Sequence, residues 1–281
     1  MDAEEQRRAS SEHWEEAAAG WARQQEAMRA FGAPVSHWLV EGIHPQPGHR
    51  VLDLAAGVGE TGFLAAELIQ PGGTLISSDQ SEGMLDAARA RAQALGLTNV
   101  EFKLINAEWI DLPVASVDGV LCRWGYMLMA DPGAALSETR RVLRPGGRLA
   151  LAVWNAPSTN PWLVLPEALM IERGLIAAPR AGAPGPLALD DPDRLRDLLE
   201  TAGFEDIEIE AVAQERREAS VDAFWDQQLD LSRNFHDAVM SLTEPESDAL
   251  RAQLQVRLAP FIHTDGRLVL PASSLVAAAS A

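Results

Sequence analysis

Apolar and polar positions between residues 48 and 154 alternate between two repeating patterns. Short apolar runs typical of buried strands occupy 51–54, 74–78, 100–105, 117–122 and 148–154. Segments with helical spacing lie between most of them, at 59–69, 81–95 and 132–143. Strands that alternate with helices of this length predict repeated βαβ units. Their right-handed crossovers build a parallel sheet with helices on both faces.

The flanking parts of the chain follow this alternation less regularly. Residues 10–40 have helical spacing, and Pro34 is expected to restart the chain. Residues 155–189 are rich in Pro, Ala and Gly, with a short helix expected at 166–173. The segments expected after them are a helix capped by Asp191, a strand at 204–211, two helices within 220–260 and a strand at 268–278. Pro271 inside that last strand indicates a sheet edge or a kink.

The whole pattern predicts an α/β protein with a Rossmann-like, doubly wound, mostly parallel seven-stranded sheet and helical lid insertions. We divide the chain into six predicted parts: an N-terminal helical cap (1–47), a cofactor-binding core (48–154), a lid insertion (155–189), a continuation of the core (190–219), a helical insertion (220–262) and a terminal strand of the core sheet (263–281).

Composition narrows the class of protein. The chain has 281 residues with 41 acidic and 23 basic side chains, a net charge of −18 that disfavours binding to nucleic acid. No apolar run reaches the roughly 18 residues that span a bilayer, and residues 1–13 do not resemble a secretory signal. Cys122 is the single cysteine, so no internal disulfide forms. We therefore expect a cytoplasmic protein, a monomer or a homodimer, with no membrane span and no nucleic-acid partner.

The strongest chemical signal is the segment Val-Leu-Asp-Leu-Ala-Ala-Gly-Val-Gly-Glu-Thr-Gly at 51–62, which runs from a strand through a glycine-rich turn into a helix. Gly57 and Gly59 permit positive φ angles and a close backbone approach to a ligand. With Gly62 they also fit the G-x-G-x-x-G pattern of dinucleotide sites, so an NAD-dependent oxidoreductase is one alternative. Asp53 disfavours that alternative, because a carboxylate near the turn repels a pyrophosphate and suits a ligand with an amino group.

Asp79 ends the second predicted strand, 22 residues after Gly57. A carboxylate at this point can accept hydrogen bonds from both hydroxyls of a ribose. Taken alone, Asp79 is more typical of an ordinary strand end or turn, and its interpretation as a ribose ligand depends on the segments around it.

In their order and spacing, these segments resemble the class I S-adenosylmethionine-dependent methyltransferases, in the branch typified by the ubiquinone and menaquinone biosynthesis enzymes. The resemblance is close over residues 48–154 and looser over 190–210. It rests on 51–62 and Ser-Ser-Asp-Gln-Ser-Glu-Gly-Met-Leu at 77–85, followed by Ile-Asn-Ala-Glu at 105–108 and Asp-Leu-Pro at 111–113. Further on it rests on Val-Asp-Gly-Val-Leu at 117–121 and Arg-Arg-Val-Leu-Arg-Pro-Gly-Gly-Arg-Leu at 140–149.

The resemblance implies S-adenosyl-L-methionine as cofactor and S-adenosyl-L-homocysteine as product, and it suggests a role for each motif residue. Gly57 and Ala55 would face the methionyl part through their backbone, and Asp53 would support its amino group. Asp79 would hold the ribose, with Gln80 beside it. The complete set of expected cofactor-binding residues is Trp21, Asp53, Ala55, Gly57, Gly59, Asp79, Gln80, Met84, Asn106, Ala107 and Arg123.

Two of these assignments, those of Met84 and Arg123, have alternatives, and Asn106 departs from the usual pattern of the family. Met84 would lie against the adenine, but a core methionine has the same spacing. Asn106 and Ala107 would read the adenine edge, although many relatives have Asp where Asn106 stands. Arg123 would approach the methionyl group or a carboxylate of the cofactor or substrate, or it is a surface arginine. Glu108 is expected to be a solvated neighbour of this set.

The chemistry of methyl transfer needs alignment and exclusion of water more than a catalytic triad. The histidines are scattered, and the sequence identifies neither a catalytic base nor a metal site. Trp14 and Trp21, seven residues apart, are expected to share a helical face over the cofactor cleft. We expect the acceptor to be a small, largely apolar molecule that is bound by a group of large apolar residues. Alternatively, each of these residues only packs the lid against the sheet. That group is Trp124, Tyr126, Met127, Trp154, Trp162, Phe224, Trp225 and Phe235.

Two rivals to a small-molecule methyltransferase stay open: the NAD-dependent oxidoreductase, and a methyltransferase-like protein that binds the cofactor without transferring a methyl group. The acceptor, the methylated atom and the pathway are not encoded in any motif of the sequence.

Overall fold

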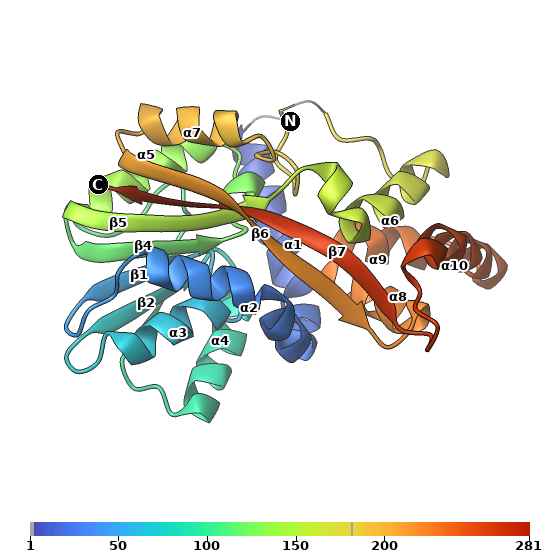
Figure 1. The fold of residues 1–281 in the computed structure, drawn as a ribbon, viewed down its shortest axis with the longest axis horizontal. Helices are drawn as coiled ribbons and strands as arrows, with labels where there is room; N and C mark the ends of the chain where they lie inside the picture. The colour runs from blue at the N-terminus through green and yellow to red at the C-terminus, as the bar shows by residue number, and fades with distance from the viewer. Residues whose placement is uncertain (1–2, 181) are drawn as a thin grey trace.

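A seven-stranded sheet forms the centre of the computed structural model, which describes residues 3–180 and 182–281 (Figure 1). The strand order is β3-β2-β1-β4-β5-β7-β6. The strands are β1 (Arg50–Leu54), β2 (Thr74–Asp79), β3 (Val100–Leu104), β4 (Val117–Arg123), β5 (Leu143–Trp154), β6 (Glu205–Glu218) and β7 (Leu268–Ser280). β1 to β5 run parallel, and β7 is antiparallel to both of its neighbours. The predicted mostly parallel, doubly wound sheet is confirmed.

Helices cover both faces of this sheet, as the right-handed crossovers require (Figure 1). On one face lie α2 (Gln25–Gly42), α3 (Glu60–Leu68) and α4 (Glu82–Leu95). On the other lie α5 (Pro132–Val142) and α7 (Pro192–Thr201). The central strands are therefore buried on two sides, which explains why they are apolar runs rather than alternating ones.

Helix ends with a local chemical signal lie where the sequence predicts them. The Ser81 hydroxyl accepts a hydrogen bond from the Met84 amide at 3.1 Å and begins α4, and Gly96 ends it with φ 71°. Asp191 caps α7, and the box of Thr243 and Glu246 begins α10 (Glu244–Leu258). Each cap pairs backbone groups that the helix itself leaves unpaired.

The predicted N-terminal helix is instead two helices. The first, α1 (Ala3–Arg23), ends at Gln24, where the side chains of Arg23 and Gln24 both bond to Asp230. Pro34 does not restart the chain, because it lies inside α2. Burial of the residues around it, among them the fully buried Val35, offsets the backbone hydrogen bond that a proline removes.

β6 and β7 are longer than predicted, and they leave the sheet together as a two-stranded ribbon (Figure 1). β5 pairs with β7 only over Ser274–Ser280, whereas β6 pairs with it as far as Leu268. β7 is thus an interior strand, not an edge strand. Pro271 lies in the part that has β6 as its one neighbour, where a strand tolerates the missing N–H.

Helices from two separate segments pack around this ribbon and form what we call the helical lobe: α6 (Pro161–Glu172), α8 (Val221–Leu231), α9 (Arg233–Met240) and α10 (Figure 1). Residues 220–260 were expected to hold two helices but hold three, because Ser232 ends α8 and its hydroxyl caps α9. No helix within the described residues is both long and apolar enough to cross a membrane. The six-part division of the chain stays a prediction.

The helical lobe has a tightly packed interior, and a large-to-small substitution there tests it. Trp225 is 4% exposed and meets the ring of Phe235 edge-on, with 4.9 Å between centroids. We expect Trp225→Ala to lower the free energy of unfolding by about 3–5 kcal/mol in urea titrations. The control is Trp109→Ala, which removes a tryptophan that is 78% exposed and should change stability by no more than about 0.5 kcal/mol. Equal stability of the two variants would contradict this packing.

Candidate functional site

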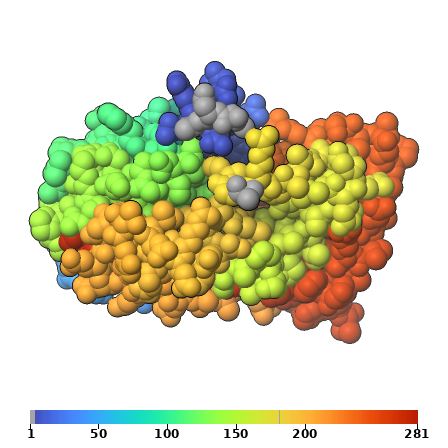
Figure 2. Space-filling view, turned by 90° about the horizontal axis from the view of Figure 1, so that it is seen from above, coloured from blue at the N-terminus to red at the C-terminus, as the bar shows by residue number. Residues whose placement is uncertain are grey.

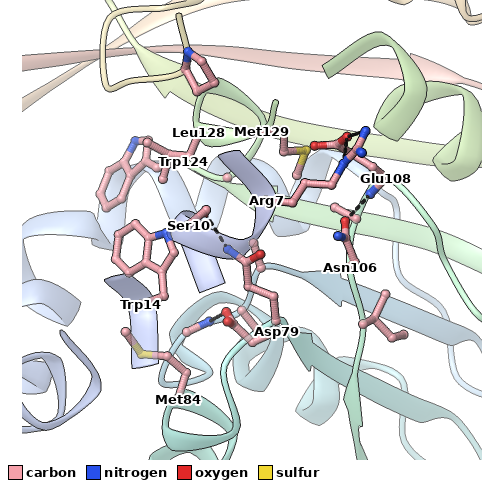
Figure 3. A pocket seen from close by; sticks show the side chains of 18 of the residues that line it. Arg7, Ser10, Trp14, Asp79, Met84, Asn106, Glu108, Trp124, Leu128 and Met129 are labelled. Atoms are coloured by element: carbon pink, nitrogen blue, oxygen red, sulfur yellow. Dashed lines mark hydrogen bonds and ion pairs between the residues drawn. The ribbon is translucent and has the colours of Figure 1, made fainter. Parts of the chain in front are cut away.

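A cavity of about 330 Å³ opens at the carboxyl ends of β1, β2 and β4 and lies beneath α1 (Figure 3). Ligands of doubly wound sheets bind at this edge. Ten of the eleven expected cofactor-binding residues line the cavity: Trp21, Asp53, Ala55, Gly57, Asp79, Gln80, Met84, Asn106, Ala107 and Arg123. The exception is Gly59, whose φ of 84° begins α3 outside the cavity and whose backbone lies under the Phe63 ring.

The turn after β1 exposes backbone to the cavity. Ala55 and Gly57 both have left-handed φ angles, of 54° and 55°. A Cβ atom added to Gly57 would meet no other atom within 4 Å, so the space in front of this residue is open. The turn can therefore receive a ligand against its main chain, which is the role that the sequence predicts for it.

Asp53 lies beneath this turn, 1% exposed, with one carboxylate oxygen accepting from the Gly62 amide at 2.8 Å. A Cβ on Gly62 would lie 2.5 Å from that oxygen. The third position of the motif must therefore be glycine for the Asp53 carboxylate to lie this close to the backbone. Burial raises the pKa of Asp53 to about 7, and the hydrogen bond from Gly62 and the charge of Arg123 only partly oppose this. A cationic group bound here would favour the ionised carboxylate.

Asp79, at the end of β2, is hydrogen-bonded to the turn after β1. Its two oxygens accept from the amides of Gly57, at 2.9 Å, and Ser81, at 3.0 Å. Burial raises the pKa of Asp79, and these backbone hydrogen bonds counteract it. Each carboxylate oxygen has two acceptor sites, so one on each oxygen is left for a diol.

Met84 and Asn106 line two further parts of the cavity wall. Met84 is both buried and part of the cavity wall, so its two interpretations do not exclude each other. Its neighbours are Ala17, Ala18 and Val58. Asn106 accepts from the Glu108 amide at 2.9 Å through its side-chain oxygen, which fixes the loop after β3 and leaves that oxygen one further acceptor site.

Glu108 is not a solvated neighbour, and that expectation was wrong. Its side chain is 6% exposed and pairs with the Arg7 guanidinium at 2.7 Å, while its other oxygen accepts from the Ala130 amide. Farther along α1, Ser10 accepts from the Gln80 amide group, and Glu15 accepts from the Gly83 backbone amide and the Ser81 hydroxyl. These contacts hold α1 as a roof over the cavity, and Trp14 and Trp21 both line it as predicted.

Arg123 is 10% exposed and lines the cavity, which excludes the interpretation as a surface arginine. Its guanidinium donates to the Ser36 hydroxyl at 2.9 Å and to the carboxylate of Glu60, and it lies 4.5 Å from the centroid of the Trp124 ring. Glu60 also pairs with Arg91 at 3.7 Å. Two arginines thus share one buried carboxylate next to the cavity.

One apolar part of the cavity wall comes from the loops after β4 and α6. It consists of Trp124, Leu128 and Met129 after β4, and Ala183 and Pro184 in the loop after α6 (Figure 3). In the space-filling view the blue N-terminal helix lies next to this yellow loop (Figure 2). Trp124 was among the expected acceptor residues. The other four carry no local signal, because their place in the wall depends on contacts between distant parts of the chain.

The expectation of an acceptor pocket built from eight large apolar residues was wrong for seven of them. Trp124 lines the cavity, but the others are buried in the hydrophobic core: Tyr126, Met127, Trp154, Trp162, Phe224, Trp225 and Phe235. Trp162, for example, packs on Trp154 with 5.0 Å between ring centroids. Packing of lid on sheet explains these seven residues.

Comparison with known proteins agrees with this geometry. A model of the methyltransferase domain family matches residues 45–175. An arsenite methyltransferase of Halobacterium salinarum is 35% identical over 206 residues, which cover 72% of this chain and 48% of that protein. A demethylmenaquinone methyltransferase of Symbiobacterium thermophilum is 32% identical over 181 residues, 59% of this chain and 72% of the relative. The crystal structure of the YcgJ protein from Bacillus subtilis shares the fold, with a TM-score of 0.60 and 16% identity over 87% of this chain and 97% of that one.

The strand order and the glycine turn with its two aspartates define a protein of the class I methyltransferase type. With these relatives, the chain belongs to the S-adenosylmethionine-dependent methyltransferase family, an enzyme family whose cofactor is S-adenosylmethionine. The resemblance to the quinone-biosynthesis branch is confirmed, and the comparisons give no support to an oxidoreductase. The chain spans about half the length of the arsenite methyltransferase that it matches.

The raised pKa of Asp53 predicts how cofactor binding depends on pH. A bound ammonium group favours the ionised carboxylate, so binding releases a proton and tightens as pH rises through about 7. We expect the affinity for S-adenosylhomocysteine, measured by calorimetry, to increase about tenfold from pH 6 to pH 8. Asp53→Asn should remove most of this dependence, because an amide does not titrate. An equally steep dependence in both proteins would show that another group is responsible.

Proposed function

We propose that this chain transfers a methyl group from S-adenosylmethionine to a small, largely apolar organic acceptor by in-line displacement. The observation that carries the proposal is one continuous cavity with two different walls. One wall is the open turn at Gly57 with Asp53 and Asp79, and the other is the apolar surface of Trp124, Leu128 and Met129. Pockets of this kind, mainly apolar with a few polar groups, bind small organic molecules.

The residues present fit the cofactor group by group. The open main chain at Gly57 and the carboxylate of Asp53 suit the methionyl part. The free acceptor sites of Asp79 suit the ribose hydroxyls, and Met84 offers a flat apolar contact for the adenine. Trp21, which lines the cavity, adds a buried indole N–H that has no hydrogen-bond partner among the described residues. A carboxylate at the methionyl end would satisfy this donor.

The chain's own contribution to the reaction is alignment and exclusion of water. S-adenosylmethionine supplies an electrophilic methyl group on a positively charged sulfur. The backbone turn orients the cofactor from below, while α1 with Trp14 closes the cavity from above. Holding the acceptor in line with the methyl group can account for several kcal/mol of the barrier without any covalent catalysis.

We further propose that the enzyme works in the cytoplasm, as a monomer or a homodimer, without a nucleic-acid partner. The net charge of −18 repels phosphodiester backbones, and the buried Cys122 suits a reducing compartment. Sedimentation analysis measures the oligomeric state directly.

Calorimetry with two ligands tests the cofactor assignment. The chain should bind S-adenosylhomocysteine and not NAD, and Asp79→Ala should weaken binding by about 1.5–3 kcal/mol, the range for hydrogen bonds to a charged group. The control is Asp86→Ala, which removes an aspartate that is 71% exposed on α4 and should bind like the parent. Binding of NAD with no response to S-adenosylhomocysteine would refute the proposed function.

A further inference from the structure

The acceptor half of the cavity has an unusual balance of charge. Glu60 is 2% exposed and pairs with both Arg123 and Arg91, so this buried triad carries a net charge of +1. Arg123 is the member that lines the cavity. Held by Ser36 and Glu60 and stacked on Trp124, its guanidinium is fixed between the Asp53 side and the apolar wall.

Three carboxylates also line the cavity: Glu108, Asp79 and Asp53. Glu108 pairs with Arg7 at the rim. Asp79 accepts from two backbone amides, and Asp53 accepts from the Gly62 amide at the cofactor end. The cationic groups of the bound cofactor would offset the charges of Asp53 and Asp79. Arg123 is the cation of the lining that lies against the apolar wall, 4.5 Å from the centroid of the Trp124 ring.

The described residues that line the cavity include no histidine, lysine, tyrosine or cysteine. Of the carboxylates among them, Asp53 and Asp79 belong to the cofactor end and Glu108 is neutralised by Arg7. A neutral alcohol would need a base to lose its proton during the reaction. An acceptor whose hydroxyl is acidic enough to ionise in solution needs none, and a fixed guanidinium stabilises its oxyanion.

We infer that the acceptor is a planar, apolar molecule with an acidic hydroxyl, a phenol or an enol, which binds as its oxyanion against Arg123. This inference rests on the proposed function. The proton leaves to solvent before or during binding. A lone pair of the oxyanion then forms the new O–C bond, while the C–S bond breaks and its electron pair stays on sulfur. A sulfonium and an oxyanion become a neutral thioether and a neutral methyl ether.

The inference also separates Arg123 from the cofactor. From the sequence alone, Arg123 is compatible with a carboxylate of the cofactor or of the substrate. The unpartnered N–H of Trp21 offers the cofactor carboxylate a donor of its own. At about pH 8.5, where Asp53 is ionised in the parent and the raised pKa of Asp53 matters least, Arg123→Gln should therefore leave the affinity for S-adenosylhomocysteine within about twofold of the parent.

Ionisation of a bound probe tests the inference without turnover. The probe is 4-nitrophenol, whose anion absorbs visible light, titrated with pH in the presence of the protein saturated with S-adenosylhomocysteine. The parent should lower the pKa of the bound phenol by about one unit, equal to a tenfold preference for the anion. Arg123→Gln should abolish this shift. The control is Arg89→Gln, which removes an arginine paired with Glu82 and Asp86 outside the cavity and should keep the shift.

Loss of Arg123 leaves Glu60 paired with Arg91, so the remaining buried pair is neutral. A second variant, Arg123→Met, removes the charge with an unbranched side chain and keeps the pair of Glu60 with Arg91. It should bind S-adenosylhomocysteine and lose the shift in phenol pKa.

Methylation assays with the parent then compare 4-nitrophenol, 4-nitrothiophenol and 4-nitroaniline. We expect turnover of the phenol to exceed that of the aniline at least tenfold. An unshifted phenol pKa in a parent that binds S-adenosylhomocysteine would overturn the inference and leave the proposed function intact. Preference for the amine or the thiol would overturn it too, as would a tenfold loss of cofactor affinity in Arg123→Gln. Failure of the parent to bind S-adenosylhomocysteine would instead refute the proposed function.

Discussion

The carboxylate of Asp79 is the contact on which the geometry of the site depends. It accepts from the Gly57 amide on one side and the Ser81 amide on the other. It thereby holds the turn after β1, the end of β2 and the start of α4 in one arrangement. The same carboxylate keeps acceptor sites free for a ligand, so one side chain connects the fold to the proposed binding of ribose. Because Ser81 is buried, loss of this carboxylate would leave its amide unpaired.

How much of the fold follows from the sequence depends on how local each signal is. Ser81, Gly96 and Asp191 mark helix ends correctly, because a cap needs only atoms within a few residues. The break at Gln24 and the length of the β6–β7 ribbon could not be predicted in this way. The first depends on Asp230, more than 200 residues away, and the second depends on the pairing of β6 with β7, which are far apart in the sequence.

The residues of the candidate site also fall into those that local sequence signals predict and those that depend on long-range contacts. Motif residues such as Gly57 and Asp79 line the cavity because their spacing on a βαβ unit fixes where they lie. Gly59 has the right spacing but supports the start of α3 instead. The ion pair of Arg7 with Glu108 joins residues 101 positions apart, and each partner alone resembles an ordinary surface charge. Large aromatic residues misled the prediction, since size alone does not distinguish a ligand contact from a core residue.

The helical lobe acts on the site through α1 rather than by lining the cavity. None of the described residues of α8, α9 and α10 forms part of the cavity wall. Instead, Asp230 of α8 binds Arg23 and Gln24, and Arg233 of α9 binds Glu16 at 3.1 Å. Gly20 packs so closely on α8 that a Cβ would lie 2.1 Å from the Asp230 carbonyl oxygen. The lobe therefore fixes one end of α1 while Arg7 and Glu15 fix the rest over the strand ends. The helical lobe, although it does not line the cavity, thus determines the position and orientation of α1 above it.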